Sequence, residues 1–284
     1  MYYLQAMRLF WNRYSRNKAA AVGAVILLII IGLGVFGPLL SPFDPSDIGG
    51  KQLASPGLTH LMGTDRLGRD VLSGVLHGIR TSLYIGFLAA LAATILGGLF
   101  GLLSGYYGGW IDDLLMRTLE FFQVLPRFFL GILLAALFGS KIELVILVIA
   151  VLSWMPAARL VRAEVMTLKG REYVLAAKGL GYSDGRIIVS ELLPNVLQLL
   201  VINTSLQIGR AMLFEASLSF LGLGDPNVPT LGQLLENAQL TLRQAWWPAL
   251  FPGALITLLV LSANLVGDGI NDALNPRAKG WDLK

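Results

Sequence analysis

The sequence predicts an all-α integral membrane protein, and three properties support that fold class. The mean hydropathy is +0.67, and 55% of the 284 residues are hydrophobic. Only 14% of the residues are charged, whereas a soluble domain carries about 25%. The apolar residues also gather into runs of about 20, the length that a helix needs to cross the hydrocarbon core of a bilayer.

Six such apolar runs predict six transmembrane helices. They cover residues 19–40, 82–105, 119–138, 142–158, 196–221 and 248–270. The first run is too long for the apolar region of a secretory signal, so we expect it to remain in the protein. The predicted organisation is an N-terminal arm (1–18), the first helix, a loop (41–81), a core of five helices (82–270) and a C-terminal tail (271–284).

The distribution of basic residues predicts which loops face the cytoplasm. With both termini inside, the cytoplasmic segments contain 14 of the 22 Lys and Arg residues and the outer loops contain 6. Cytoplasmic loops of membrane proteins carry such an excess. The segments predicted to be cytoplasmic are 1–18, 106–118, 159–195 and 271–284.

Composition and motifs exclude several functional classes. The chain has no cysteine, which excludes disulfides and thiolate metal sites. His60 and His77 are the only histidines, and we expect them to be solvated loop residues and not metal ligands. No basic stripe with interleaved aromatic residues is present, so a nucleic-acid partner has no support.

Enzymatic motifs are also absent from the sequence. It has no GxxxxGK[ST] phosphate-binding loop, so any ATP-driven step requires a separate ATPase polypeptide. GxSxG and HExxH motifs and paired intramembrane aspartates are absent as well, which argues against an intramembrane hydrolase. We therefore predict a chain that is not an enzyme.

A long polar segment, residues 171–195, has its own helical pattern. We predict a short helix over residues 172–180 and a break at Gly179 and Gly181, because glycine adopts positive φ at little cost. A second helix then begins with Ser183 or Asp184 as its cap.

The second helix of this segment has one apolar side and a predicted end. Ile187, Ile188 and Leu192 fall on one side of it, and Pro194 is expected to end it, since proline has no backbone N–H to donate. An amphipathic helix of this kind suits a groove on a partner protein. An ordinary cytoplasmic loop helix is the alternative.

Polar residues inside the predicted fifth span form a second candidate site. Asn203, Gln207 and Arg210 recur at i, i+4 and i+7 and so share one helix face. A charge at the bilayer centre costs about 3 kcal/mol or more, so this face should look away from lipid. It either lines a hydrated pathway or bonds to neighbouring helices. Glu215 is a possible but poorly phased partner for Arg210.

Two further patterns concern the other spans. Pro126, just before Arg127, is expected to break the third span. Glycines at small-xxx-small spacing in the second span are expected to allow close helix packing; they are Gly97, Gly98, Gly101 and Gly105.

Four stretches of the sequence resemble one known family. Ala176-Ala177, Gly181 and Leu193-Pro194 resemble the EAA loop of ABC importer permeases. LMGTDRLGRDVLSGVLHGIRTSL, EASLSFLGLG and GDGINDALNPR are similar to stretches of the C-type permease of the dipeptide/oligopeptide/nickel importers. The chain departs from the family pattern at Gly74, Leu175, Glu191, Asn271 and Asn275.

The resemblance implies a type I ABC importer permease fold with a cytoplasmic coupling helix, in the bacterial plasma membrane. The implied partners are a homologous B-type permease, two ATPase subunits and an extracytoplasmic binding protein. ATP and Mg²⁺ would bind only to the ATPases, so no cofactor is expected on this chain. The residues assigned to ATPase coupling are Glu172, Ala176, Ala177, Gly181, Ser183, Asp184 and Pro194.

Di- or oligopeptides are the cargo that the resemblance favours, with nickel or a metal chelate as the alternative. The alternative from another class is a secondary transporter or channel that works alone. Such a protein would require an inverted repeat or an acidic proton relay along its spans. Neither is visible in this sequence.

Overall fold

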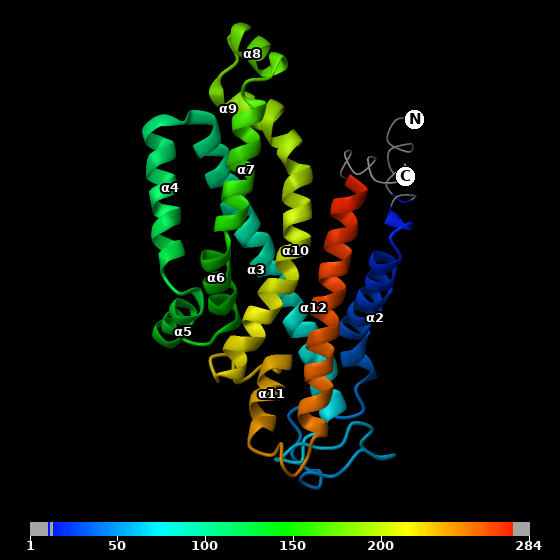
Figure 1. The fold of residues 1–284 in the computed structure, drawn as a ribbon. Helices are drawn as coiled ribbons and strands as arrows, with labels where there is room; N and C mark the ends of the chain where they lie inside the picture. Colours follow the sequence, from blue (N-terminus) through cyan, green and yellow to red (C-terminus); the bar gives the residue numbers. More distant parts are fainter. Residues whose placement is uncertain (1–10, 12–13, 275–284) are drawn as a thin grey trace.

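A computed structural model describes residue 11 and residues 14–274 of the chain (Figure 1). These residues form a bundle of helices, with one isolated β-bridge between Thr64 and Asp70. The helices are α2 (Lys18–Leu40), α3 (Val71–Tyr107), α4 (Gly109–Val124), α5 (Arg127–Phe138), α6 (Ile142–Ser153), α7 (Met155–Leu168), α8 (Glu172–Gly179), α9 (Asp184–Arg186), the π-helical turn η1 (Ile187–Leu192), α10 (Leu193–Phe220), α11 (Leu231–Gln239) and α12 (Trp247–Leu274).

Four straight helices are long and apolar enough to cross a membrane: α2, α3, the continuous helix Asp184–Phe220, and α12. Two further spans are possible if each of two bent helix pairs counts as one. The pair α4 and α5 bends by 88°, and the pair α6 and α7 bends by 44°. The first bend lies at Leu125-Pro126, where the sequence predicted a break.

Helix α3 begins earlier than the sequence predicted. It starts at Val71 and not at residue 82, so the predicted loop 41–81 is shorter than expected. The reason is a helix cap, because the Asp70 side chain accepts a hydrogen bond from the backbone N–H of Ser73 at 2.8 Å. Residues 71–81 mix apolar residues with Ser73, His77 and Arg80, so an apolar count leaves this first part of the helix out.

The predicted loop 106–118 is mostly helical. Gly108 and Gly109 have φ of +65° and +54° and turn the chain between α3 and α4. Asp112 then holds α4 against α7 through two hydrogen bonds from Arg162, both of 2.6 Å. Helix α7 likewise runs on to Leu168, ten residues beyond the predicted end of the fourth span.

Three of the four predicted glycines of α3, Gly97, Gly101 and Gly105, lie against α7 and its start, which confirms the predicted close packing, whereas Gly98 faces Leu200 of α10. A Cβ at Gly101 would lie 2.5 Å from the carbonyl oxygen of Ala158, and one at Gly105 would lie 2.8 Å from the Cβ of Val165. Only hydrogen fits at these positions. Helices that cross this closely gain van der Waals contact along their backbones.

Both histidines make side-chain contacts within the chain, whereas the sequence predicted that they are solvated loop residues. His60 Nδ1 lies 2.9 Å from Asp70 Oδ1, and His77 Nδ1 lies 2.9 Å from the carbonyl oxygen of Ser73 in the first turns of α3. His60 thus ties the loop that precedes α3 to the N-cap of this helix, whereas His77 bonds within α3. This loop and α11 lie together at one end of the bundle (Figure 1).

The other end of the bundle carries α8 and α9, together with the start of α2 and the end of α12 (Figure 1). Asn17, the cap of α2, donates a hydrogen bond to Asp272 near the end of α12 at 3.0 Å. Most of the predicted N-terminal arm, and the tail beyond residue 274, lie outside the described residues.

Candidate functional site

The α8–α9 segment projects beyond the other helices and is held by an apolar cluster (Figure 1). Val174 and Ala177 of α8 are buried, as are Ile187 and Leu192 of η1, whereas Ile188 is partly buried. This matches the predicted apolar side of the segment. The buried members of the cluster, drawn from α3, α7, α8, η1 and α10, are Leu102, Val161, Val165, Val174, Ala177, Ile187, Leu192 and Val196.

The turn between α8 and α9 requires glycine at one position. Gly181 has φ of +79° and no atom within 4 Å of where a Cβ would stand. The N–H of Tyr182 reaches back to the carbonyl oxygen of Ala177 at 3.1 Å, the bond that typically ends a helix with a left-handed residue. Backbone conformation, and not lack of space, therefore selects glycine here.

Ser183 and Asp184 differ in what they contact. Ser183 is the N-cap residue of α9, but its side chain makes no capping hydrogen bond. Asp184 accepts a hydrogen bond of 2.6 Å from the hydroxyl of Tyr106, at the end of α3. Asp184 thus joins the α8–α9 segment to the bundle.

The prediction that Pro194 ends the second helix is wrong. The helix continues through η1 into α10 and forms one unbroken helix, Asp184–Phe220, of 37 residues. In the π-helical turn the N–H of Leu193 bonds to the carbonyl oxygen of Ile188. This wider turn lets proline, which has no N–H to donate, sit in the first turn of the following α-helix.

The outward side of the α8–α9 segment mixes polar and apolar residues. Glu172 and Ala176 are exposed. Leu175 is 56% exposed, Leu180 is 75% exposed and Val189 is 62% exposed. Exposed apolar residues next to polar ones are typical of a protein–protein contact.

The polar residues of the second candidate site do not all point the same way. Gln207 is buried and donates a hydrogen bond of 2.8 Å to the carbonyl oxygen of Ser153. That carbonyl lies at the bend between α6 and α7, where the helical bonding is interrupted. Asn203 is partly buried and Arg210 is exposed. Gln207 therefore bonds to a neighbouring helix, whereas Arg210 faces outward from this chain.

Glu215 is fully buried and contacts serines, not Arg210. Its carboxylate accepts hydrogen bonds from Ser219 at 2.7 Å and from Ser82 of α3 at 3.1 Å. Ser82 in turn accepts a bond of 3.2 Å from the N–H of Leu231, the first residue of α11. Glu215 thus connects three helices within the bundle.

Comparison with known proteins decides the family of this chain. The family model described as the binding-protein-dependent transport system inner membrane component matches residues 97–280. A second model, the N-terminal TM domain of oligopeptide transport permease C, matches residues 6–56. The chain belongs to the family of binding-protein-dependent transport permeases.

Relatives of this permease match over nearly its whole length. It is 37% identical to the dipeptide transport system permease protein DppC of Alkalihalophilus pseudofirmus, over 95% of this chain and 89% of the relative. It is 36% identical to the di/tripeptide transport system permease protein DppC of Pseudomonas aeruginosa, over 98% of this chain and 94% of the relative. These matches confirm the resemblance that the sequence motifs indicated.

A solved structure shows the same fold. A chain of the MetNI methionine ABC transporter, in an inward-facing conformation, superposes with a TM-score of 0.57 and 16% identity. The match covers 71% of this permease and 97% of that chain. The permease therefore has the type I ABC importer permease fold.

Proposed function

We propose that this permease is the transmembrane subunit of an ATP-driven, binding-protein-dependent importer of di- or oligopeptides. The observation that carries the proposal is the α8–α9 segment, which projects from the bundle and continues without a break into α10. The names of the relatives, which are dipeptide and di/tripeptide permeases, support peptides as cargo. The permease itself conducts cargo, and partner subunits hydrolyse ATP.

The proposed complex pairs this permease with a homologous B-type permease. Two ATPase subunits receive the two α8–α9 segments, and an extracytoplasmic binding protein docks at the opposite end, where α11 and the loop before α3 lie. The exposed Leu175, Leu180 and Val189 supply apolar contacts to the ATPase. Closure of the ATPases then moves the segment, and the bundle alternates between outward and inward access.

A labelling experiment tests the proposed orientation. The chain has no native cysteine, so each introduced cysteine is the only residue of this chain that a thiol reagent labels. We expect Ser46→Cys, in the exposed loop before α3, to react with a membrane-impermeant maleimide added to intact cells. Ser183→Cys, also exposed but at the other end, should react only after the cells are permeabilised. The reverse pattern would contradict the proposal, because the ATPases could not reach the α8–α9 segment.

A substitution at Gly181 tests the coupling role of the segment. Valine at φ of +79° is strained by about 1–3 kcal/mol, so the turn between α8 and α9 should change shape. We expect Gly181→Val to lower ATP hydrolysis stimulated by the loaded binding protein about tenfold in the reconstituted complex. Gly185→Val is the matched control, because Gly185 is exposed and does not have positive φ. Unchanged stimulation in Gly181→Val would remove this turn from the mechanism.

A further inference from the structure

Several exposed arginines on the membrane helices have no ion-pair partner within residues 14–274. Three of them are Arg127 at the start of α5, Arg159 in α7 and Arg210 in α10. Arg162, one turn after Arg159, differs because it forms a two-bond pair with Asp112. A charge within a membrane span is costly unless it faces water or an opposite charge. These three arginines therefore require something that this chain alone does not supply.

Arg127 and Arg159 line one groove. The groove has a volume of about 440 Å³, and none of its described lining residues is a carboxylate. Arg159 donates a hydrogen bond to the side-chain oxygen of Gln123, which leaves most of its guanidinium donors free. The lining residues are Gln123, Arg127, Met155, Pro156, Arg159 and Leu160, with Ala163.

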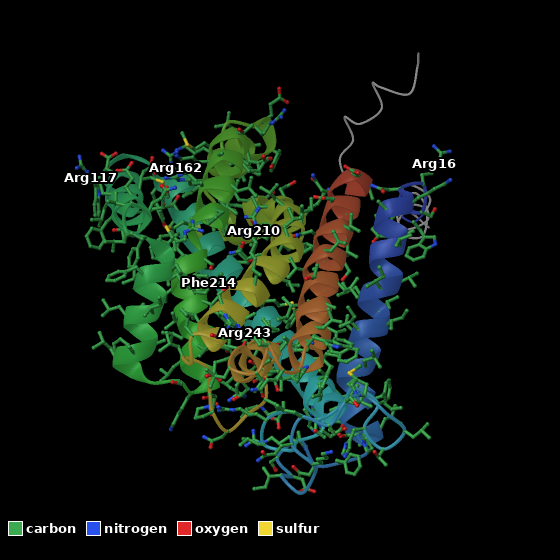
Figure 2. The ribbon with its side chains drawn as sticks, turned by 60° about the horizontal axis from the view of Figure 1, so that its bottom comes forward. Arg16, Arg117, Arg162, Arg210, Phe214 and Arg243 are labelled. Atoms are coloured by element: carbon green, nitrogen blue, oxygen red, sulfur yellow. The ribbon has the colours of Figure 1, made fainter. Side chains whose placement is uncertain are left out.

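An aromatic pair links α10 to α5. Phe214, one helical turn after Arg210, packs edge-on against Phe128, and the ring centroids are 6.1 Å apart. Phe128 follows Arg127 in α5, so Arg127 and Arg210 lie on two helices that are in contact, although Arg210 does not line this groove. Figure 2 shows Arg210 and Phe214 in succession along α10, inside the outline of the bundle, whereas Arg117 lies at its edge.

A second groove begins at the same ring pair and leads toward the other end of the bundle. It has a volume of about 400 Å³, includes Phe128 and Phe220, and reaches Leu235 of α11. None of the described residues that line it is charged. The first groove thus carries Arg127 and Arg159, and the second is apolar. Arg210 is exposed on α10, the helix that supplies Leu213, Ala216 and Ser217 to the second groove.

We propose that Arg210, Arg127 and Arg159 are specificity-determining residues that bind the carboxylate of a peptide cargo in turn during transport. This inference rests on the proposed function. A free peptide carries a carboxylate at its C-terminus, and the planar guanidinium binds carboxylates through two parallel hydrogen bonds. The apolar walls of the grooves accept peptide side chains of differing shape. Several sites of moderate strength let the cargo enter and also leave, which one tight site would prevent.

An experiment that changes only the charge at Arg210 tests this proposal. The Arg210→Cys variant, in the complete complex in proteoliposomes, is treated with a trimethylammonium-ethyl or a sulfonatoethyl methanethiosulfonate, which have similar size and opposite charge. Uptake of alanyl-alanine should fall about tenfold in Arg210→Cys, as for loss of one charge-assisted hydrogen bond. The cationic reagent should restore much of the uptake, and the anionic reagent should not.

Arg117→Cys is the matched control. Arg117 is an exposed arginine of α4 that lies at the edge of the bundle, away from Arg210 (Figure 2), so neither reagent should change uptake there. Equal uptake after both reagents, or no labelling of Arg210→Cys, would overturn the proposal. If Arg210→Cys does not assemble, Arg127→Cys and Arg159→Cys are treated with the same two reagents. Restoration of uptake by the cationic reagent alone then supports the proposal, and equal uptake after both reagents overturns it.

Varying the lipid composition separates cargo binding from lipid binding. The same variants are measured in liposomes with and without phosphatidylglycerol, because an apolar groove with two arginines also suits an anionic lipid headgroup. An effect that disappears without the anionic lipid would assign the arginines to lipid and overturn the proposal. If the unmodified complex takes up neither alanyl-alanine nor longer alanine peptides, the proposed function fails. If it does, and the charge at Arg210 has no effect, only this inference fails.

Discussion

Replacing Gly101 with valine is expected to destabilise the permease severely. The new side chain would meet the backbone of α7, since even a Cβ would lie 2.5 Å from the carbonyl oxygen of Ala158 and 2.7 Å from the Cβ of Val161. Backbone atoms cannot move aside as a flexible side chain can. We expect a loss of about 3 kcal/mol or more, seen as a lower thermal midpoint of the purified protein in detergent.

Gly32→Val is the matched control for this substitution. Gly32 also lies in a membrane helix, α2, but no atom stands within 4 Å of its Cβ position. Its thermal midpoint should stay close to that of the parent. If Gly101→Val were as stable as Gly32→Val, the close crossing of α3 and α7 would not be a source of stability.

Glu215→Ala is expected to have the second largest effect. The substitution leaves a cavity and removes the acceptor of two hydrogen bonds, from Ser82 and Ser219, in a fully buried place. Unsatisfied buried groups and the cavity together should cost about 3 kcal/mol. Because Ser82 also holds the start of α11, protease cleavage near α11 should become faster, which limited proteolysis can measure.

One variant separates the contribution of the hydrogen bonds of Glu215 to stability from the contribution of its charge, and a second variant serves as a control. Glu215→Gln keeps an oxygen acceptor and a similar volume, so it should retain most of the stability that Glu215→Ala loses. Glu236→Ala, on α11, is the control, because Glu236 makes no side-chain hydrogen bond among residues 14–274 and is only partly buried. Equal stability of Glu215→Ala and the parent would show that the three-helix connection through Glu215 contributes little.

Local signals in the sequence predicted local features correctly. Four of the six apolar runs fall in the four helices that are long and apolar enough to cross a membrane. Pro126 marked the bend between α4 and α5, and glycine was expected where Gly181 adopts positive φ. The early start of α3 also had a signal, Asp70 followed by Ser73 three residues later, which is a helix-capping pattern. An apolar count does not register it, because residues 71–81 include polar residues such as His77 and Arg80.

Other features depend on contacts that sequence spacing does not reveal. The sequence pattern predicted that the helix ends at Pro194. In the structure, Ile187 and Leu192 pack against α3 and α7 and stabilise a π-helical turn, and the helix therefore continues beyond Pro194. Arg127 and Arg159 are far apart in the chain and share a groove only because α4, α5 and α7 fold together. The helical period placed Gln207 and Arg210 on one face of α10. In the structure, Gln207 is buried and donates a hydrogen bond to the carbonyl oxygen of Ser153 at the bend, whereas Arg210 is exposed.

The unbroken helix from Asp184 to Phe220 makes α10 a lever arm. With 37 residues at about 1.5 Å each, it is about 55 Å long. A tilt of about 5° about its inner end would move its far end by about 5 Å, which is roughly one helical turn. Arg210 lies about two thirds of the way along this arm and would move by about 3 Å, enough to make or break a guanidinium–carboxylate contact. If an ATPase contacts the α8–α9 segment as proposed, a small rotation there becomes a displacement of several ångström at Arg210.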